Sequence, residues 1–86
     1  MEFEFDPKKS EANKTKHGID FSEARALWND PDVLEIPVDT GDEPRILVVG
    51  RILGKHWSGI ITCEGNRTRI ISVRRSRTEE VNVFEG

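Results

Sequence analysis

The sequence of 86 residues has no tyrosine, a single cysteine and no apolar run that approaches the length of a membrane-spanning helix. A membrane span needs about 20 consecutive apolar residues, so we expect a soluble protein of the cytoplasm. One cysteine, Cys63, can form neither an internal disulfide nor a metal cluster. Because it lies inside an apolar run, we expect it to be buried as a small apolar side chain.

Several motifs of enzyme chemistry are missing as well. The sequence has no glycine-rich phosphate loop, no cluster of residues at metal-ligand spacing and no Ser-His-Asp arrangement. These absences argue against a P-loop enzyme, a metalloenzyme and a serine hydrolase. We therefore expect no metal and no cofactor.

The net charge of −3 conceals a separation of charge along the chain. The first 44 residues carry five basic and twelve acidic side chains, a net −7. From Arg45 to Thr78 there are eight basic side chains and one acid, Glu64, a net +7. The remaining residues, 79–86, contribute −3. A segment this basic predicts an anionic partner.

The N-terminal half is predicted to be helical after one short strand. Phenylalanines alternate with glutamates over residues 2–5, which is typical of a half-buried strand. Asp6-Pro7 then starts a helix that should end within a residue of His17, before Gly18. That helix has almost no apolar face, so something besides apolar packing must hold it. A second helix should follow over residues 20–28, with capping-box spacing at its start and one apolar stripe.

The C-terminal half has the pattern of β-strands. After an acidic, turn-rich loop at residues 39–44, apolar runs at 45–53, 56–63 and 68–75 are separated by hairpin-like turns. Residues 33–38 are a candidate edge strand, and residues 78–85 could form a short helical turn. We therefore predict one α+β domain over residues 1–86. It would have a short N-terminal strand and two helices packed on an antiparallel sheet of three to four strands.

The last predicted strand carries the most informative motif. From Arg69 to Arg77 the chain reads R-I-I-S-V-R-R-S-R, an apolar strand that ends in arginines. Guanidinium groups are planar donors that match phosphate. Arg74 and Arg75 are adjacent and should point to opposite faces, whereas Arg69 should share a face with Ile71 and Val73.

These and other motifs resemble the BrnT family of bacterial toxins. The similarity lies in F-E-F-D-P-x-K from Phe3, N-x-x-K-H-G-I-x-F-x-E-A from Asn13, R-I-L-V-V-G from Arg45, I-I-T from Ile60 and R-I-I-S-V-R-R from Arg69. The resemblance implies a type II toxin–antitoxin system and a RelE-like ribonuclease fold. The implied partners are RNA and a DNA-binding antitoxin of the ribbon-helix-helix type, similar to BrnA. A dimer of toxin–antitoxin pairs is compatible with it.

The resemblance also suggests which residues carry the chemistry. RNA cleavage without a metal needs a base for the 2′-OH proton, cations for the scissile phosphate and an acid for the leaving 5′-oxygen. His17 would be the acid or a phosphate-binding cation, and Glu80 would orient an arginine or act as the base. The catalytic candidates are His17, Arg74, Arg75 and Glu80; the RNA-binding candidates are Lys16, Arg69 and Arg77.

Each candidate also has an ordinary structural explanation. His17 could bond a carbonyl at the end of the first helix, the arginines could be solvated edge residues, and Glu80 could be an exposed tail residue. Trp57 is expected in the core or at its rim rather than stacked on a base.

The C-terminal stretch departs from the family. Relatives commonly have a basic C-terminal helix with a tyrosine near its end, but here the stretch reads E-E-V-N-V-F-E-G, with Phe84 at that place. Two functions therefore compete, and a third, non-specific RNA binding without chemistry, is supported only by the basic segment. One is a ribonuclease toxin that inhibits translation and growth. The alternative is a catalytically weakened member that binds its antitoxin and helps to repress the operon.

Overall fold

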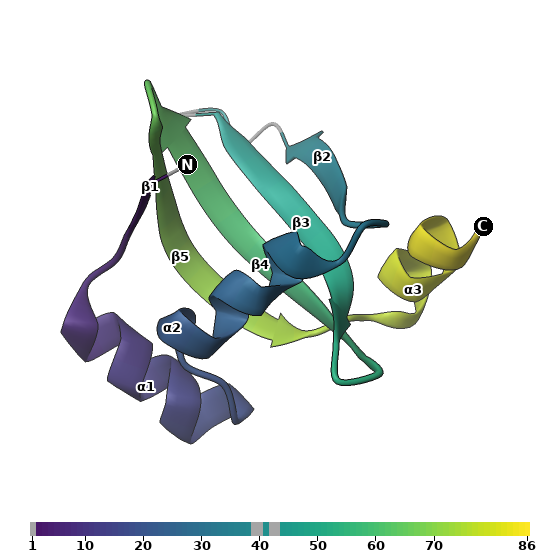
Figure 1. The fold of residues 1–86 in the computed structure, drawn as a ribbon, viewed down its shortest axis with the longest axis horizontal. Helices are drawn as coiled ribbons and strands as arrows, with labels where there is room; N and C mark the ends of the chain where they lie inside the picture. Colours follow the sequence, from purple (N-terminus) through teal and green to yellow (C-terminus); the bar gives the residue numbers. More distant parts are fainter. Residues whose placement is uncertain (1, 39–40, 42–43) are drawn as a thin grey trace.

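The computed structural model describes residues 2–38, 41 and 44–86, so most of the predicted acidic loop at 39–44 lies outside the described residues. A five-stranded sheet forms the centre of the molecule (Figure 1). The elements are β1 (Glu2–Glu4), α1 (Pro7–His17), α2 (Phe21–Ala24), the 3-10 helix η1 (Arg25–Asn29), β2 (Leu34–Val38), β3 (Arg45–Ile52), β4 (Lys55–Glu64), β5 (Arg67–Arg75) and α3 (Thr78–Glu85).

The predicted α+β class is confirmed, but the sheet is larger than expected and mixed. Its order is β1-β5-β4-β3-β2, and β2 is the edge strand anticipated at residues 33–38. The N-terminal strand β1 joins the far edge and runs parallel to β5, while all other pairs are antiparallel. Alternation in the sequence identifies a strand but not its neighbour, so this long-range pairing was missed.

The helices α1, α2 and η1 lie on one face of the sheet (Figure 1). Phe21 and Leu27 from these helices are buried against Val48, Ile61 and Val73 of the strands. The capping box that starts the second helix is confirmed. The Asp20 carboxylate accepts from the Glu23 N–H at 2.7 Å, and the Glu23 carboxylate accepts from the Asp20 N–H at 3.0 Å. The expected single helix is nevertheless wrong, because the chain tightens from α2 into η1 at residue 25.

Helix α1 is attached by two buried polar side chains rather than by apolar ones. The Asn13 amide nitrogen donates to the carbonyls of Ile19 and Val73, both at 2.8 Å. Its oxygen accepts from the Val73 N–H at 3.2 Å. Ser10 Oγ accepts from the Phe21 N–H at 2.9 Å. These bonds explain how a helix with almost no apolar face is held on the sheet.

A bulge in β5 changes which side chains share a face. Ile60 pairs with Ser72 and Ile61 with Ile70, so the register skips one residue between them. Val73 therefore turns to the helix-covered face and is 1% exposed, while Arg69 is exposed. The prediction that Arg69 shares a face with Val73 was wrong because a bulge breaks the two-residue period.

The prediction that Cys63 is buried was also wrong. Cys63 is exposed, whereas its partner across the hairpin, Thr68, is buried. The residue lies at the end of β4, beside the β4–β5 turn and beyond the part of the strand that the helices cover. Trp57, in contrast, is half-buried and packs against the core, as predicted.

The other face of the sheet, here called the outer face, carries Leu47, Ser58, Ile60 and Arg74, which the register places side by side. Leu47 and Ile60 are only half-buried. Helix α3 packs at one end of the sheet, away from α1 and α2 (Figure 1). The chain thus presents α3 to a different part of the sheet from the other helices.

Candidate functional site

Arg74 and Glu80 form a bidentate ion pair between β5 and α3. The two terminal nitrogens of Arg74 donate to the two carboxylate oxygens of Glu80, each at 2.7 Å. Both side chains are largely enclosed, with 27% of Arg74 and 13% of Glu80 exposed. This fork-to-fork geometry holds the guanidinium group in one orientation.

Further polar groups fasten Glu80. Ser58 Oγ donates to its carboxylate at 2.9 Å and lies 2.7 Å from the hydroxyl of Ser76. The N–H of Arg77 at the start of α3 donates to the same carboxylate at 2.8 Å. These bonds, with that from Arg74 the largest, lower the pKa of Glu80 to about 2. The carboxylate is therefore ionised at neutral pH and is a weak base.

The ion pair leaves part of the Arg74 guanidinium uncommitted. One terminal nitrogen bonds Glu80 and, at 3.3 Å, the carbonyl of Arg75, and the other bonds Glu80 alone. Among the described residues, the Nε–H and the second N–H of that other nitrogen make no hydrogen bond. Arg74 is thus a fixed cation with donors left for an anion.

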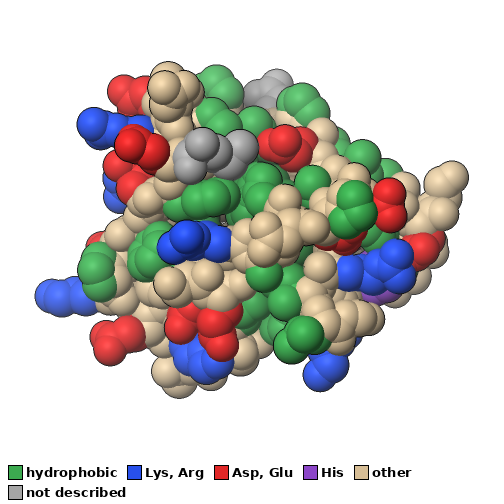
Figure 2. Space-filling model, in the orientation of Figure 1, with side chains coloured by type: hydrophobic (Ala, Val, Ile, Leu, Met, Phe, Trp, Pro, Cys, Tyr) green, Lys and Arg blue, Asp and Glu red, His purple; other side chains and the backbone are tan. Residues whose placement is uncertain are grey.

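A second polar pair lies on the same face, one step along β4. His56 Nε2 is 2.6 Å from a carboxylate oxygen of Glu85, near the end of α3. The ring of Phe84 packs edge-to-face on His56, with centroids 5.5 Å apart, and Arg51 lies over the same phenyl ring. In Figure 2 a histidine is visible beside charged side chains at the α3 end of the molecule.

The two pairs form one group, here called the α3 cluster: Arg51, His56, Ser58, Arg74, Glu80 and Glu85. Ser58 is the cross-strand partner of Arg74, and His56 is two residues before Ser58 on the same face. His56 is then a diagonal neighbour of Arg74, at about 7–8 Å between Cα atoms. The α3 cluster therefore combines an oriented cation with an imidazole–carboxylate pair, which are groups that can transfer protons beside an anion.

Comparison with known proteins identifies the family. Residues 5–80 match the family described as the ribonuclease toxin BrnT of type II toxin–antitoxin systems. The chain belongs to the BrnT family. The protein is accordingly a ribonuclease toxin, with RNA as its substrate and an antitoxin as its partner. No single curated protein matches the chain.

The structure agrees with this assignment at the level of the fold. The α+β arrangement of helices on a mixed sheet is consistent with a RelE-like fold. In the part of the chain that the structure describes, no helix is long and apolar enough to cross a membrane.

Of the four residues proposed as catalytic from the sequence, the fold brings two together, Arg74 and Glu80. Arg75 points to the opposite face, where its guanidinium lies 5.4 Å from the Trp57 ring centroid and its Nε–H donates to the His56 carbonyl at 3.1 Å. His17 is the half-buried last residue of α1, on the helix-covered face, and it has no hydrogen bond or ion pair within the described residues.

The RNA-binding candidates are dispersed. Lys16 is exposed near the end of α1, and Arg77 is exposed at the start of α3. Arg69 is exposed on β5, with its guanidinium 3.8 Å from Glu4. These three side chains surround the sheet rather than converge on one point.

Four members of the α3 cluster, Arg51, His56, Ser58 and Glu85, were not identified from the sequence. A partial signal was present, because a two-residue turn at 53–54 places residues 51 and 56 directly opposite each other. Nothing in the sequence indicated that α3 would return to this end of the sheet and set Glu85 on His56.

Proposed function

We propose that this toxin cleaves RNA in the cytoplasm without a metal ion, at the α3 cluster, and thereby inhibits translation and growth. The observation that carries the proposal is the position of Arg74. Its guanidinium is held by Glu80, keeps free donors and lies next to the His56–Glu85 pair. Family membership supplies RNA as the substrate.

The reaction needs a base, an acid and a cation, and the α3 cluster supplies candidates for the base and the cation. A base removes the proton of the 2′-OH, the 2′-oxygen bonds to phosphorus, and the bond from phosphorus to the 5′-oxygen breaks. The leaving 5′-oxygen takes a proton from an acid, which gives a 2′,3′-cyclic phosphate and a free 5′-OH. Arg74 would stabilise the charge that gathers on the phosphoryl oxygens, a role worth about 2–4 kcal/mol for a single donor.

His56 is the proposed proton-transfer group. If the Glu85 carboxylate accepts from Nε2–H, the neutral ring keeps a lone pair on Nδ1 that can take the 2′-OH proton. Glu80 acts as a positioning residue for Arg74, since a carboxyl group with a pKa of about 2 is poorly suited to be the base. His17 and Arg75, the other catalytic candidates from the resemblance, have no role assigned at the α3 cluster, and Lys16 and Arg77 remain candidate RNA contacts.

The two histidines make a matched test. His56→Gln should lower kcat on single-stranded RNA by about 10²–10⁴-fold, the range for a lost general acid or base, whereas His17→Gln should have little effect. Arg74→Lys should lose about 10²-fold while keeping a positive charge beside Glu80. Circular dichroism of each variant checks the fold, and EDTA in the assay tests the absence of a metal.

Two outcomes would overturn the assignment. If His17→Gln abolishes cleavage and His56→Gln does not, the site lies on the helix-covered face. If growth arrest on induction of the toxin persists in both Arg74→Ala and His56→Gln, the α3 cluster is not the active site.

One observation favours the second candidate function, a weakened member that acts mainly as an antitoxin-binding module. Phe84 packs on His56 and under Arg51, in the middle of the α3 cluster, but lacks the hydroxyl of a tyrosine. On this reading Phe84→Tyr raises the cleavage rate of a slow wild-type enzyme and leaves antitoxin affinity unchanged. An already fast wild type that Phe84→Tyr does not improve would reject the weakened-member reading.

We further propose that the partner is a ribbon-helix-helix antitoxin similar to BrnA, and that two toxin–antitoxin pairs dimerise to repress the operon. Family membership supports an antitoxin. Co-expression with the product of the neighbouring gene and light scattering of the purified complex test both points. A complex with the mass of one toxin–antitoxin pair would contradict the dimer.

A further inference from the structure

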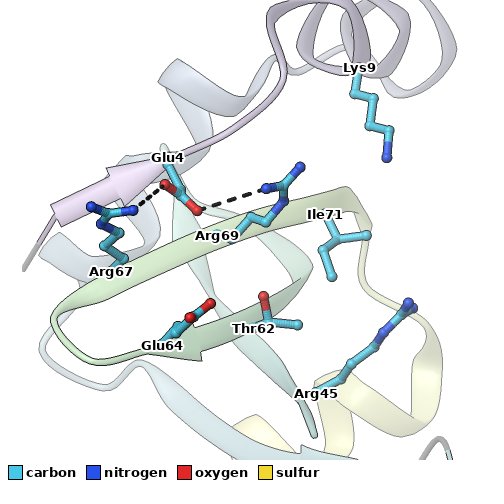
Figure 3. A pocket seen from close by; sticks show the side chains of 8 residues that line it. All are labelled: Glu4, Lys9, Arg45, Thr62, Glu64, Arg67, Arg69 and Ile71. Atoms are coloured by element: carbon cyan, nitrogen blue, oxygen red, sulfur yellow. Dashed lines mark ion pairs between the residues drawn. The ribbon is translucent and has the colours of Figure 1, made fainter. Parts of the chain in front are cut away.

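A basic hollow of about 400 Å³ lies at the opposite end of the outer face from α3. Four cationic side chains from three elements line it: Lys9 of α1, Arg45 of β3, and Arg67 and Arg69 of β5. Glu4 of β1 lies between the two β5 arginines. Figure 3 shows Lys9 reaching toward the hollow from the helix, while Arg45 rises from the other side.

The hollow has an excess of positive charge. Lys9, Arg67 and Arg69 face two carboxylates, Glu4 and Glu64, and Arg45 adds a fourth cation to the lining. The Glu4 carboxylate lies 3.8 Å from the guanidinium nitrogens of both Arg67 and Arg69, which is longer than a hydrogen bond. Among the described residues neither guanidinium group makes a hydrogen bond, so their N–H donors are available to an anion.

The lining suits a phosphate better than a peptide. Thr62 adds a hydroxyl donor, and Ile71 is the single apolar side chain among the lining residues. A docked peptide segment needs apolar contact at its centre, which this hollow does not offer. A phosphodiester needs cations and hydrogen-bond donors, which it does offer.

The hollow and Arg74 lie along the same strand and on the same face. Before the bulge in β5, Arg67, Arg69 and Ile71 face outward; after it, Ser72 and Arg74 do. Five residues of strand separate Arg69 from Arg74, about 16 Å at the usual rise. A single strand of RNA with its scissile phosphate at Arg74 could therefore reach the hollow with a phosphate a few nucleotides away.

We propose that this basic hollow is a subsite for a backbone phosphate of the RNA substrate, a few nucleotides from the bond that is cut. Lys9 and Arg69 are its principal cations, and Thr62 donates from the floor. The subsite rests on the proposed function at the α3 cluster and makes the enzyme prefer RNA long enough to span both places.

A length-dependent assay tests this with a matched pair of lysines. Lys8 and Lys9 are adjacent and exposed on α1, but only Lys9 lines the hollow. We expect Lys9→Gln and Arg69→Gln each to raise KM for a 12-nucleotide single-stranded RNA about 3–10-fold, while Lys8→Gln does not. The slope of log Kd against log salt for the same RNA should fall by about 0.7 for each removed contact, the value for one phosphate on a single strand. In Lys9→Gln and Arg69→Gln, the ratio of kcat/KM for the 12-mer to kcat/KM for a trinucleotide should also fall.

The outcomes separate the subsite from the active site. Equal losses in Lys8→Gln and Lys9→Gln, or an unchanged preference for the 12-mer, would overturn the subsite while leaving the α3 cluster untouched. If Lys9→Gln and Arg69→Gln weaken the antitoxin instead of RNA, the hollow binds an acidic protein segment. Should the wild type cleave neither RNA, the proposed function fails, and binding of the 12-mer to the same variants still decides the subsite.

Discussion

Glu80 serves both the stability of the fold and the orientation of a functional side chain. Its carboxylate receives bonds from Arg74, Ser58 and the first turn of its own helix, so one residue attaches α3 to β5 and β4. The same bonds prevent Arg74 from adopting other rotamers, which is what a cation aimed at a reacting phosphate requires. At this scale stability and proposed function depend on the same contacts.

Protonation of Glu80 should make the toxin less stable in acid. The pKa of Glu80 is lowered to about 2 in the folded state, below its usual value, so the unfolded chain binds the proton first. The stabilisation is complete above about pH 5 and is lost as the pH falls from about 5 to about 2, amounting to about 3 kcal/mol. Urea unfolding across this range should show a shallower pH dependence in Glu80→Gln than in wild type.

The neighbouring Glu79 supplies the control for that measurement. Glu79 lies in the same first turn of α3 but is exposed, so Glu79→Gln should keep the wild-type slope. Parallel pH profiles for wild type and Glu80→Gln would show that the ion pair adds nothing to stability.

Leu53 should be a site where substitution stabilises the fold. It sits in the two-residue turn between β3 and β4 with φ +51° and a side chain that is 98% exposed. A left-handed conformation costs an L-residue with a bulky side chain about 1 kcal/mol, and Asn-Gly is the preferred pair for such a turn. Leu53→Asn should therefore raise the free energy of unfolding by about 1 kcal/mol.

Leu53→Ala separates the backbone effect from the exposure effect. It removes the exposed apolar side chain but keeps a Cβ in the left-handed region, so chemical denaturation should give nearly the wild-type stability. Equal stability of Leu53→Asn and wild type would mean that the turn is not strained.

At the scale of elements, α1 shows that buried hydrogen bonds can hold in place a helix that has almost no apolar face. Its buried side chains, Ser10 and Asn13, are polar, and both bind main-chain groups outside the helix. Asn13 connects the helix to the loop before α2 and to the part of β5 just before Arg74. The helix therefore helps to set the position of the strand that carries the proposed catalytic arginine.

Asn13→Ala should be among the more damaging single substitutions in the toxin. It leaves the Val73 N–H and two main-chain carbonyls without their side-chain partner in a buried position, at a cost of about 3 kcal/mol. Urea unfolding gives the value, with Thr15→Ala on the exposed side of the same helix as a control expected to change stability by less than about 0.5 kcal/mol. A loss no greater than that of Thr15→Ala would show that α1 is held in another way.

For the whole molecule, the separation of charge becomes a separation in space. The basic segment from Arg45 to Thr78 forms three strands of the sheet and supplies most cations of the outer face. The acidic N-terminal segment forms the helices of the other face and the two edge strands, and adds Lys9 to the hollow. The half-buried apolar side chains of the outer face, such as Leu47 and Ile60, leave it less completely packed than the core. Such a molecule has surface left to bind an anionic substrate and a protein partner.

Binding of the antitoxin at 100 times its Kd should raise the melting temperature of the toxin by about 10–20 °C. A partner that binds only the folded state adds about 2.7 kcal/mol when present at 100 times its Kd. For a domain of this size each 1 kcal/mol shifts the melting temperature by about 4–8 °C. Calorimetry of the toxin alone and in complex measures the shift, and an unrelated acidic protein serves as the control. Identical melting temperatures would contradict specific binding of the folded toxin.

Much of the local structure follows from the sequence by itself. Asp6-Pro7 and Gly18 determine where α1 begins and ends, the capping box at Asp20 starts α2, and alternating apolar residues define β3, β4 and β5. These features depend on neighbours close in the chain, so short-range rules predict them. The same short-range rules predict that the adjacent side chains of Arg74 and Arg75 point to opposite faces of the sheet.

Only the tertiary structure decided what those elements bring together. The pairing of β1 with β5 joins residues far apart in the sequence. The bulge that turns Val73 inward breaks the regular period of β5. The return of α3 to the sheet places Glu80 on Arg74 and Glu85 on His56. Long-range contacts of this kind are determined by the total packing of the chain and not by any one segment. For that reason the sequence could point to Arg74 and Glu80 separately, whereas the α3 cluster and the basic hollow became visible only in the folded protein.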